Sequence, residues 1–590
     1  MIKARAAAWV GFVAVTAAIL AGGFARWPVP DGLVRDSLNA HGVHDSAVRW
    51  ARPDAATFRA LPWPSLHFYN AKLAGDGDVA VSAPEARLDL SLGELLIGRL
   101  IPTRATLIRP IVEVEVGTLS FAATSLGRLL GARREFAPLT EISLVDGVVR
   151  IVDKNHGFDT VLENVGGRIE GLESGETLRV DLSAVWRETP LAFSGSLTSL
   201  GAGADGLNAF VIGLKSPVIE LAAAGGVAIG RAPSLTGDLA LTVHSLNQLS
   251  RVSGLPRPAF FVSDDVAISG KIKAGADDLT LGEATITSAG QTFQGAIQIS
   301  EFRGRASVSG TLDSEQLAIE PLFGSPQPLL EQDGRWSRHP VALFTPRDFD
   351  LDLRLSAGVV DLYGRKLTNV AASVLLKRDE MTVSLIEAEA FGGKLEGEAT
   401  LSHPSEALDL RARAKLTDAD FGAMLSSFDL PIASGTGSAD FAIAARGRTL
   451  AEAIDSVNGT ASLDLERGAL GGVNLEEALR RSQRRQPDLL RDVRVGETAF
   501  DRLTLSALAG DGVIHIGDGL LAARGLSAAI RASVDLPLQT VDLAIDATQT
   551  DASGQASKDA AQLNLILKGP LEAPNLTLGN PDGKPQPPKE

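Results

Sequence analysis

The stretch GGKLEGEATL, residues 392–401, alternates apolar and polar side chains with a period of two. Leu395, Ala399 and Leu401 fall on one parity, and the charged and hydroxyl side chains fall on the other. Such alternation predicts a β-strand with one apolar face and one solvated face. The next stretch, ALDLRARAKL at residues 407–416, repeats the pattern and places Leu408 and Leu410 on its apolar parity.

The same alternation continues from about residue 65 almost to the end of the chain. Turn signals such as GDGD, SGET, KRDE and AGDG separate many of the segments. The clearest predicted strands are ARLDLSL (86–92), VVRIVD (148–153), LRVDLSAV (178–185), FDLDLRL (349–355), ASLDLE (461–466), AIRASVDL (529–536) and LNLILK (563–568). A weak repeat of three strands in about 40 residues favours a meander or solenoid over alternating βαβ units.

Composition narrows the class of protein. The chain has 590 residues, of which 45% are hydrophobic but only 5% aromatic, so its apolar faces consist mainly of Leu, Val, Ile and Ala. The formal charge of -16 argues against a nucleic-acid partner, whose phosphates would be repelled. The absence of cysteine excludes disulfides, thiolate nucleophiles and sulfur-ligated metals.

The N-terminal region predicts a membrane anchor. Lys3 and Arg5 precede an uncharged run at residues 6–25, and twenty helical residues span roughly 30 Å, the thickness of a bilayer core. The anchor side chains are Trp9, Val10, Phe12, Val13, Val15, Ile19 and Leu20. Basic residues before the span place the amino terminus in the cytoplasm and the remainder outside it. A cleaved signal peptide is the alternative, because Gly23 and Ala25 suit the small-residue rule before a cut.

Predicted helices are few and short. Thr449 with Glu452 and Asn474 with Glu477 have the spacing of capping boxes at helix starts. These helices are too small to cover roughly five hundred residues of sheet. The apolar faces therefore pack on other sheets, in sandwiches or a closed solenoid, or line a curled sheet that stays open. The strand pattern alone does not decide between these two.

Motif-like segments resemble the AsmA-like family of bacterial envelope proteins. In the N-terminal half they are SLHFYNAKLAG (65–75) and APEARLDLSLGELLIGRLIPTRATLIRPIVEVEV (83–116). In the C-terminal half they are GRWSRHPVALFTPRDFDLDLRL (334–355), AFGGKLEGEATL (390–401), VNGTASLDLERGALGGVNLEEALRR (457–481) and KGPLEAPNLTL (568–578). The resemblance covers nearly the whole chain in the expected order.

This resemblance implies a mostly β protein: a long twisted antiparallel sheet curled into an open hydrophobic groove, with few short helices and one N-terminal transmembrane helix. AsmA-like proteins are anchored in the inner membrane, extend into the periplasm and are similar to bridge-like lipid transfer proteins. The family is tied to outer-membrane homeostasis and, for its longer members, to phospholipid movement between membranes. It implies phospholipid and membrane partners, possible envelope protein partners, and neither enzyme activity nor catalytic residues. A structural scaffold of the envelope with closed sandwich packing is the alternative function.

Two groups of residues are candidates for contact with lipid. Aliphatic side chains predicted to line the groove are Leu395, Ala399, Leu401, Leu408, Leu410, Leu463, Leu465, Ile530 and Val534. Each of them is also compatible with an ordinary core between two sheets. A basic run on one predicted helix offers contact with anionic headgroups or an acidic partner, against the alternative of a solvated face; it comprises Arg480, Arg481, Arg484 and Arg485.

Signals for cofactors, metals and catalysis are weak. GAGADG at residues 201–206 matches G-x-G-x-x-G, but a strand-like segment follows where a dinucleotide site needs a helix. His41, His44 and Asp45 lack a supporting cluster of ligands, so a solvated loop is the better interpretation. We expect no cofactor and no metal. A hydrolase of unrecognised type is the remaining rival.

The predicted organisation has six parts. These are a cytoplasmic stub and anchor (1–26), a connecting segment (27–64), an N-terminal β-groove region (65–324), a connection (325–348), a C-terminal β-groove region (349–579) and a disordered tail (580–590).

Overall fold

The computed structural model describes most of the chain. The described residues are 16, 21–29, 48–51, 55–75, 79–115, 139–153, 158–171, 177–199, 207–228, 234–254, 262–275, 278–302, 305–325, 328–340, 349–378, 380–402, 407–430, 432–483, 496–551, 555–556 and 560–579. They form two compact units, one made of residues 1–258 with 263–306 and the other of residues 307–590 with 259–262.

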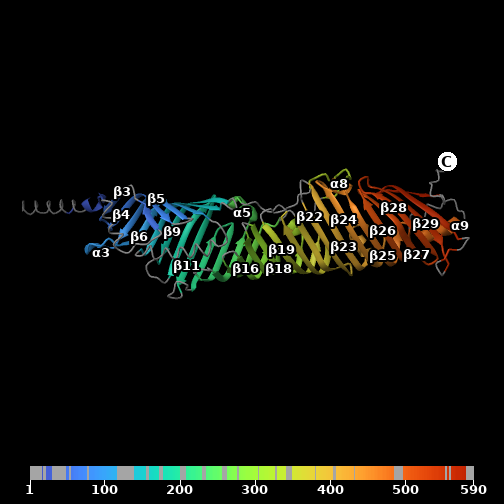
Figure 1. The fold of residues 1–590 in the computed structure, drawn as a ribbon, viewed down its shortest axis with the longest axis horizontal. Helices are drawn as coiled ribbons and strands as arrows, with labels where there is room; N and C mark the ends of the chain where they lie inside the picture. The colour runs from blue at the N-terminus through green and yellow to red at the C-terminus, as the bar shows by residue number, and fades with distance from the viewer. Residues whose placement is uncertain are drawn as a thin grey trace, which may run out of the picture. The chain divides into compact units, whose positions relative to one another are not determined.

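The N-terminal unit is a sheet whose consecutive strands pair mostly antiparallel (Figure 1). Its elements are β1 (Trp27–Pro28), β2 (Val48–Ala51), β3 (Ala55–Arg59), β4 (Ser65–Gly75), β5 (Val79–Leu90), α3 (Leu92–Leu96), β6 (Pro102–Ile108), β7 (Ile111–Glu115), β8 (Glu141–Asp153), β9 (Phe158–Glu170), β10 (Thr177–Trp186), β11 (Thr189–Ser199), β12 (Leu207–Lys215), β13 (Ile219–Ala228), β14 (Ser234–Val243), α5 (Leu246–Ser253), β15 (Val266–Ala274), β16 (Asp278–Ser288) and β17 (Gln291–Phe302). Strand β8 pairs in parallel with β6 and β7.

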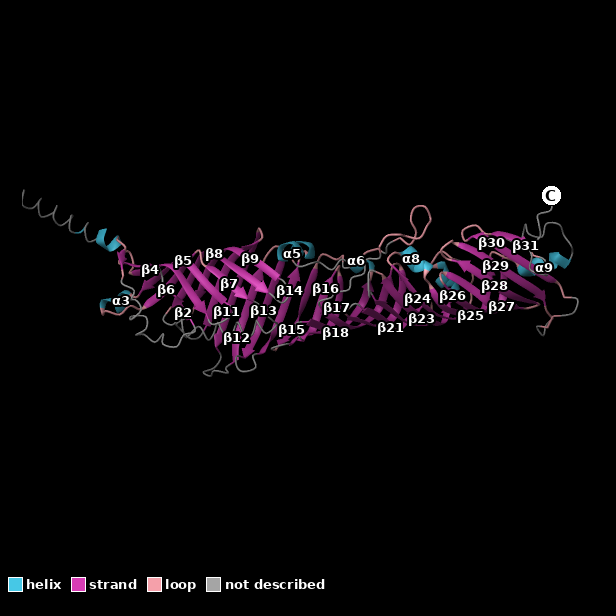
Figure 2. Ribbon diagram, turned by 45° about the horizontal axis from the view of Figure 1, so that its top comes forward, coloured by secondary structure: helices cyan, strands magenta, loops and turns pink. Residues whose placement is uncertain are grey.

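The C-terminal unit is likewise a sheet of sequential antiparallel strands, with short helices near its margins (Figure 2). Its elements are β18 (Arg305–Ala318), which begins at the end of the first unit, α6 (Glu320–Phe323), β19 (Phe349–Leu362), β20 (Arg365–Lys377), β21 (Glu380–Ala390), β22 (Gly393–Ser402), β23 (Leu408–Asp420), α7 (Phe421–Ser426), β24 (Thr436–Gly447), α8 (Leu450–Asp455), β25 (Asn458–Gly471), α9 (Leu475–Gln483), β26 (Glu497–Gly510), β27 (Val513–Ala523), β28 (Leu526–Asp535), β29 (Thr540–Gln549), β30 (Gln562–Pro570) and β31 (Asn575–Leu578).

The stretch GGKLEGEATL forms the turn into β22 and most of that strand. Ala390 pairs with Gly393, so Phe391 and Gly392 are the two loop residues of a hairpin. Both have positive φ, +53° and +76°, as a type I′ turn requires. This turn matches the right-handed twist of the strands and fixes the register of β21 against β22.

β-Bulges recur inside the strands and preserve the apolar face. On β21, Leu385 pairs with Gly397 and Ala388 pairs with Leu395, so one extra residue is inserted opposite β22. Strand β23 has the same insertion, with Asp418 at a φ of +56° between the buried Leu416 and Ala419. The apolar residues on either side of each bulge are three positions apart, which in a regular strand would place them on opposite faces. The inserted residue returns them to the same face. Bulges also bend and twist a strand.

Each unit contains one large cluster of buried hydrophobic residues. In the C-terminal unit the cluster joins strand residues such as Leu465, Leu503 and Leu521 to Phe421 of α7 and Leu475 of α9. In the N-terminal unit the cluster centres on β4 to β6 and reaches β13.

Most expectations about secondary structure are confirmed. The seven clearest predicted strands lie within or largely within strands, although β5 ends at Leu90 and Leu92 begins α3. The N-cap half of both predicted capping boxes forms: Thr449 Oγ1 accepts from the amide of Glu452 at 3.2 Å, and Asn474 Oδ1 accepts from the amide of Glu477 at 2.9 Å. The carboxylate of Glu452 accepts from the amide of Arg448. Residues 27–64, expected to be a connecting segment, contain the short strands β1, β2 and β3.

The membrane anchor predicted at residues 6–25 falls mostly outside the described residues, and so do all seven of its named side chains. Residues 21–24 are helical. Within the described part of the chain, no helix combines the length and hydropathy that a membrane crossing needs.

A core truncation should measure how tightly the C-terminal cluster is packed. Leu465 is fully buried, so we predict that Leu465→Ala lowers the free energy of unfolding by about 2–5 kcal/mol through lost burial and a residual cavity. Hydrogen exchange on peptides from β25 and β26 would measure the loss. Leu508→Ala is the control, because Leu508 on β26 is 62% exposed and should change stability by less than about 0.5 kcal/mol. Equal effects of the two substitutions would contradict the assigned core.

Candidate functional site

The main candidate site is the apolar face of the C-terminal sheet. Strand register places uncharged side chains opposite one another in rows that cross many strands. One row, here called the alanine row, contains Val383, Ala399, Ala412, Ile443, Gly459 and Ala509. A neighbouring row, here called the phenylalanine row, contains Leu385, Gly397, Ala414, Phe441, Ala461 and Ala507. Beyond β26 the same face carries Ile514, Val534 and Val541 in paired positions.

Helices cover one end of this face. Leu475, Ala478 and Leu479 of α9 are buried in the C-terminal cluster, and α9 packs against β26, β29 and β30. The alanine and phenylalanine rows lie outside that cluster along the same strands. Their side chains stay partly accessible, and Phe441 is 41% exposed. The face thus has a sealed end and a half-exposed middle.

All nine predicted lining residues lie on this one face. Leu465 and Ile530 are buried in the C-terminal cluster, and Leu395 and Leu463 pack against it. The other five, Ala399, Leu401, Leu408, Leu410 and Val534, are half-buried and lie outside the cluster. Leu401 pairs directly with Leu410, and Ala399 pairs with Ala412.

The opposite face of the same strands is charged. Lys394 Nζ lies 2.9 Å from a carboxylate oxygen of Glu396, and Arg413 lies 3.4 Å from Glu398. The hydrogen bond from Lys394, together with its charge, holds the pKa of Glu396 below its usual value. A hollow of about 540 Å³ on this face is bordered by Glu396, Glu398 and Arg413. The two faces of the sheet therefore differ completely in charge.

The basic run is divided by the structure. Arg480 and Arg481 lie on α9 and both bind Glu477, with Arg481 Nε donating to Glu477 Oε1 at 2.6 Å. These two hydrogen bonds, Arg481's first, lower the pKa of Glu477. Their charge is therefore partly neutralised by an internal partner. Arg484 and Arg485 lie outside the described residues.

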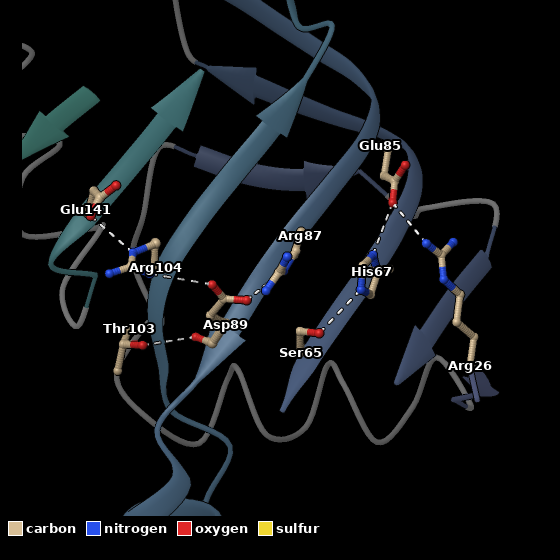
Figure 3. A network of polar contacts seen from close by, with 9 residues as sticks. All are labelled: Arg26, Ser65, His67, Glu85, Arg87, Asp89, Thr103, Arg104 and Glu141. Atoms are coloured by element: carbon tan, nitrogen blue, oxygen red, sulfur yellow. Dashed lines mark hydrogen bonds and ion pairs between the residues drawn. The ribbon is translucent and has the colours of Figure 1, made fainter. Parts of the chain in front are cut away.

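A polar network on the N-terminal sheet was not found from sequence. Figure 3 shows Ser65, His67 and Glu85 in line on β4 and β5. Ser65 Oγ lies 3.3 Å from His67 Nε2, and His67 Nδ1 lies 3.1 Å from Glu85 Oε1. Serine, histidine and carboxylate in this order resemble a hydrolase triad. The sequence signal is Ser65 and His67 two positions apart on one strand, but only the β4–β5 pairing brings Glu85 beside them.

The burial of this network points to a structural role. Ser65 is 1% exposed and His67 is 4% exposed, so a substrate carbonyl has no path to the Ser65 hydroxyl. Burial, as the largest cause, lowers the pKa of His67 below its usual value of 6.5. The neutral ring fits both contacts, because Nδ1–H donates to Glu85 and Nε2 accepts from Ser65. Farther along the network, Asp89 and Arg104 connect β5 and β6 to Glu141 of β8.

The described residues contain no group of three or more His, Asp or Glu side chains arranged to hold a metal. His41, His44 and Asp45, and the whole GAGADG stretch (201–206), lie outside the described residues.

The buried histidine predicts a pH dependence. Because the folded-state pKa of His67 is lowered, the unfolded chain takes up the proton more readily, and stability falls as the pH drops below about 6.5. Urea unfolding followed by tryptophan fluorescence from about pH 8 to about pH 5 would measure this loss. In His67→Gln, which cannot take up a proton there, the loss should be smaller. Identical pH profiles for the two proteins would contradict the assignment.

Comparison with known proteins supports the family assignment. The model of the AsmA family matches residues 182–518, which is more than half of the chain. The match includes β19 to β26 and most of β27, and therefore most of the apolar face described above. A comparison with curated proteins finds no significant match. The resemblance inferred from sequence motifs is confirmed, and the chain belongs to the AsmA family.

Proposed function

We propose that this protein carries or shields phospholipid acyl chains on the apolar face of its sheet, and so supports lipid transport between membranes and outer-membrane homeostasis. The observation that carries the proposal is the half-exposed middle of that face, where the alanine and phenylalanine rows contain no charged side chain. Membership of the AsmA family and the long runs of sequential strands are compatible with it.

The free energy gained when an acyl chain leaves water is large enough to hold a lipid on the apolar face. Moving an acyl chain out of water is worth about 0.8 kcal/mol per CH₂, hence on the order of 10 kcal/mol for a chain of about 16 carbons. A continuous aliphatic wall recovers much of this, while a charged headgroup stays in water. Without fixed polar groups in the rows, no position along the wall holds one lipid in preference to the next. Such a surface suits sliding more than tight binding.

Side-chain size supports an open groove over a filled sandwich. A packed core between two sheets needs large side chains that interdigitate across a gap of about 10 Å. Here many row positions are alanine or glycine, among them Gly397, Ala412, Ala461 and Ala509. Small side chains leave space above the sheet that a lipid chain fills. The recurrent bulges bend the strands, which is the deformation that a curled sheet requires.

We place the protein at the bacterial inner membrane, with a cytoplasmic amino terminus and the bulk of the chain in the periplasm. The uncharged run at residues 6–25, preceded by Lys3 and Arg5, supports this location. The proposal includes no enzymatic step.

The second candidate is a non-transporting scaffold of the envelope. The sealed end of the face favours it, because there α9 shows that protein can cover these strands. Lipid content separates the two functions: a groove should copurify with phospholipid after gentle extraction, and a closed scaffold should not.

Photo-crosslinking in living cells tests the proposal directly. A photoreactive amino acid at Ile443 faces the apolar side of β24, and the same probe at Ala442 faces the charged side. We expect lipid adducts from position 443 and few from position 442. Equal labelling from the two positions would overturn lipid binding on this face.

Charge placed on the apolar face should block lipid movement. We predict that Leu401→Arg with Ile443→Arg reduces phospholipid transfer between vesicles by at least about tenfold, because acyl chains would have to pass buried charge. Thr400→Arg with Ala442→Arg is the matched control, since these neighbours lie on the same two strands and face the other way. The unfolding midpoint of each variant confirms that it is folded. Full transfer by the folded Leu401→Arg, Ile443→Arg variant would refute the groove.

A further inference from the structure

The N-terminal unit carries a second apolar surface that the lipid-carrying face does not explain. We call it the α3 patch; it comprises the exposed side chains Phe24, Trp27, Trp63, Leu92, Leu96 and Ile97. Leu96 is 80% exposed and Ile97 is 65% exposed, and α3 buries none of its residues. A helix in a soluble protein normally buries one apolar face, so a helix that buries no residue and exposes Leu92, Leu96 and the adjacent Ile97 needs another explanation.

Backbone contacts bring the patch together at one end of the sheet. The amide of Leu61 donates to the carbonyl of Gly23 at 2.7 Å, which joins the turn between β3 and β4 to the helical residues 21–24. The amide of Leu90 donates to the carbonyl of Pro64 at 2.8 Å, so the end of β5, where α3 begins, lies beside the same turn. Figures 1 and 2 both show α3 at this end of the N-terminal sheet.

The loop that carries α3 projects from a fixed base. The amide of Ser91 donates to the carbonyl of Ile101 at 2.9 Å, which joins the two ends of the loop that contains α3. Arg99 lies 3.7 Å from Glu94 within the loop, so the loop's two opposite charges partly offset each other. What the loop presents to its surroundings is therefore mainly apolar.

From this arrangement we infer that the α3 patch docks on the surface of a phospholipid bilayer, as a membrane contact separate from the N-terminal anchor. The uncharged run at residues 6–25 ends at Gly23 to Ala25, in contact with the same turn that carries Trp63. A bilayer that holds this run must lie at this end of the unit. Tryptophan is enriched at membrane interfaces, and exposed Leu and Ile side chains gain burial in the outer acyl region.

The inference rests on the membrane anchoring proposed above and not on lipid carriage. Docking would hold the N-terminal end of the sheet against the bilayer surface by two connections. With one connection alone, the unit would be free to swing about residues 25 and 26. Two connections fix the orientation of this end of the sheet relative to the bilayer.

Site-specific fluorescence in the full-length protein tests the docking. The chain has no cysteine, so Leu96→Cys gives a single position for a polarity-sensitive dye. The labelled protein is reconstituted into vesicles of phosphatidylethanolamine and phosphatidylglycerol, and quenching by brominated lipids is measured. Leu508→Cys, exposed on the charged face of the C-terminal sheet, is the matched control. We expect strong quenching at position 96 and little at position 508.

A second variant tests the patch as a whole. Leu92→Asp with Ile97→Asp, added to Leu96→Cys, should lower the quenching at position 96 at least about twofold, because two acidic side chains oppose insertion. Both residues are exposed, so the unfolding midpoint should not change.

Each other outcome overturns the inference in a recognisable way. Protein that floats with the vesicles but shows equal quenching at positions 96 and 508 retains its anchor and lacks docking. A blue-shifted dye at position 96 without quenching by brominated lipid means that protein covers the patch. Failure to float with vesicles removes both the anchoring and the docking. Lipid transfer is not part of the readout, so failure of the transport proposal leaves this result unaffected.

Discussion

The structure depends on the strict registration of antiparallel strands whose side chains alternate. A slip of one residue between any two strands would turn every apolar side chain of one strand to the charged face. The register is fixed by tight hairpins such as the Phe391–Gly392 turn and by bulges that insert one residue without changing which face the apolar residues share. Since consecutive strands pair in order, each hairpin transmits the register to the next. Neighbouring apolar side chains are therefore collected into continuous rows.

Much of this follows from the sequence because alternation is a local property. GGKLEGEATL and ALDLRARAKL are enough to predict the faces of Leu395, Ala399 and Leu410, and the pairings place all of them together. The bulges were not predicted, although EMTVSLIEAEA carries a phase shift: Leu385 and Ala388 share a face while Ile386 between them is exposed. An inserted residue of this kind cannot be told from an ordinary break in the alternation until the pairing with the partner strand is known.

Features that depend on distant partners could not be predicted. The pairing of Arg480 and Arg481 with Glu477 is different, because these partners are three and four residues apart on one helix and their spacing predicts the contact. The link between His67 and Glu85 arises only when β4 pairs with β5, eighteen residues apart in sequence. The short strands at residues 27–64 could not be recognised from the sequence, because this segment is rich in proline and tryptophan and lacks the alternation of apolar and polar residues. The exposure of α3 could not be predicted either, because the sequence LGELLIGRL does not show whether other parts of the chain cover its apolar side chains.

The length of the helices determines which part of the apolar face they cover and which part stays exposed. A helix of nine residues such as α9 is about 13 Å long and about 10 Å wide, whereas a strand of fourteen residues such as β25 runs for about 46 Å. The described helices can therefore seal the end of the face at Leu465 and cannot extend over Ala461 and Gly459 on the same strand. In water, the uncovered rows carry an unfavourable hydration free energy that protein packing does not remove. The acyl chain of the proposed function would offset that cost wherever it lay along the rows, and larger side chains in the rows would remove the space that it needs. In the proposed function, the many alanines and glycines of the rows keep that space open for the acyl chain.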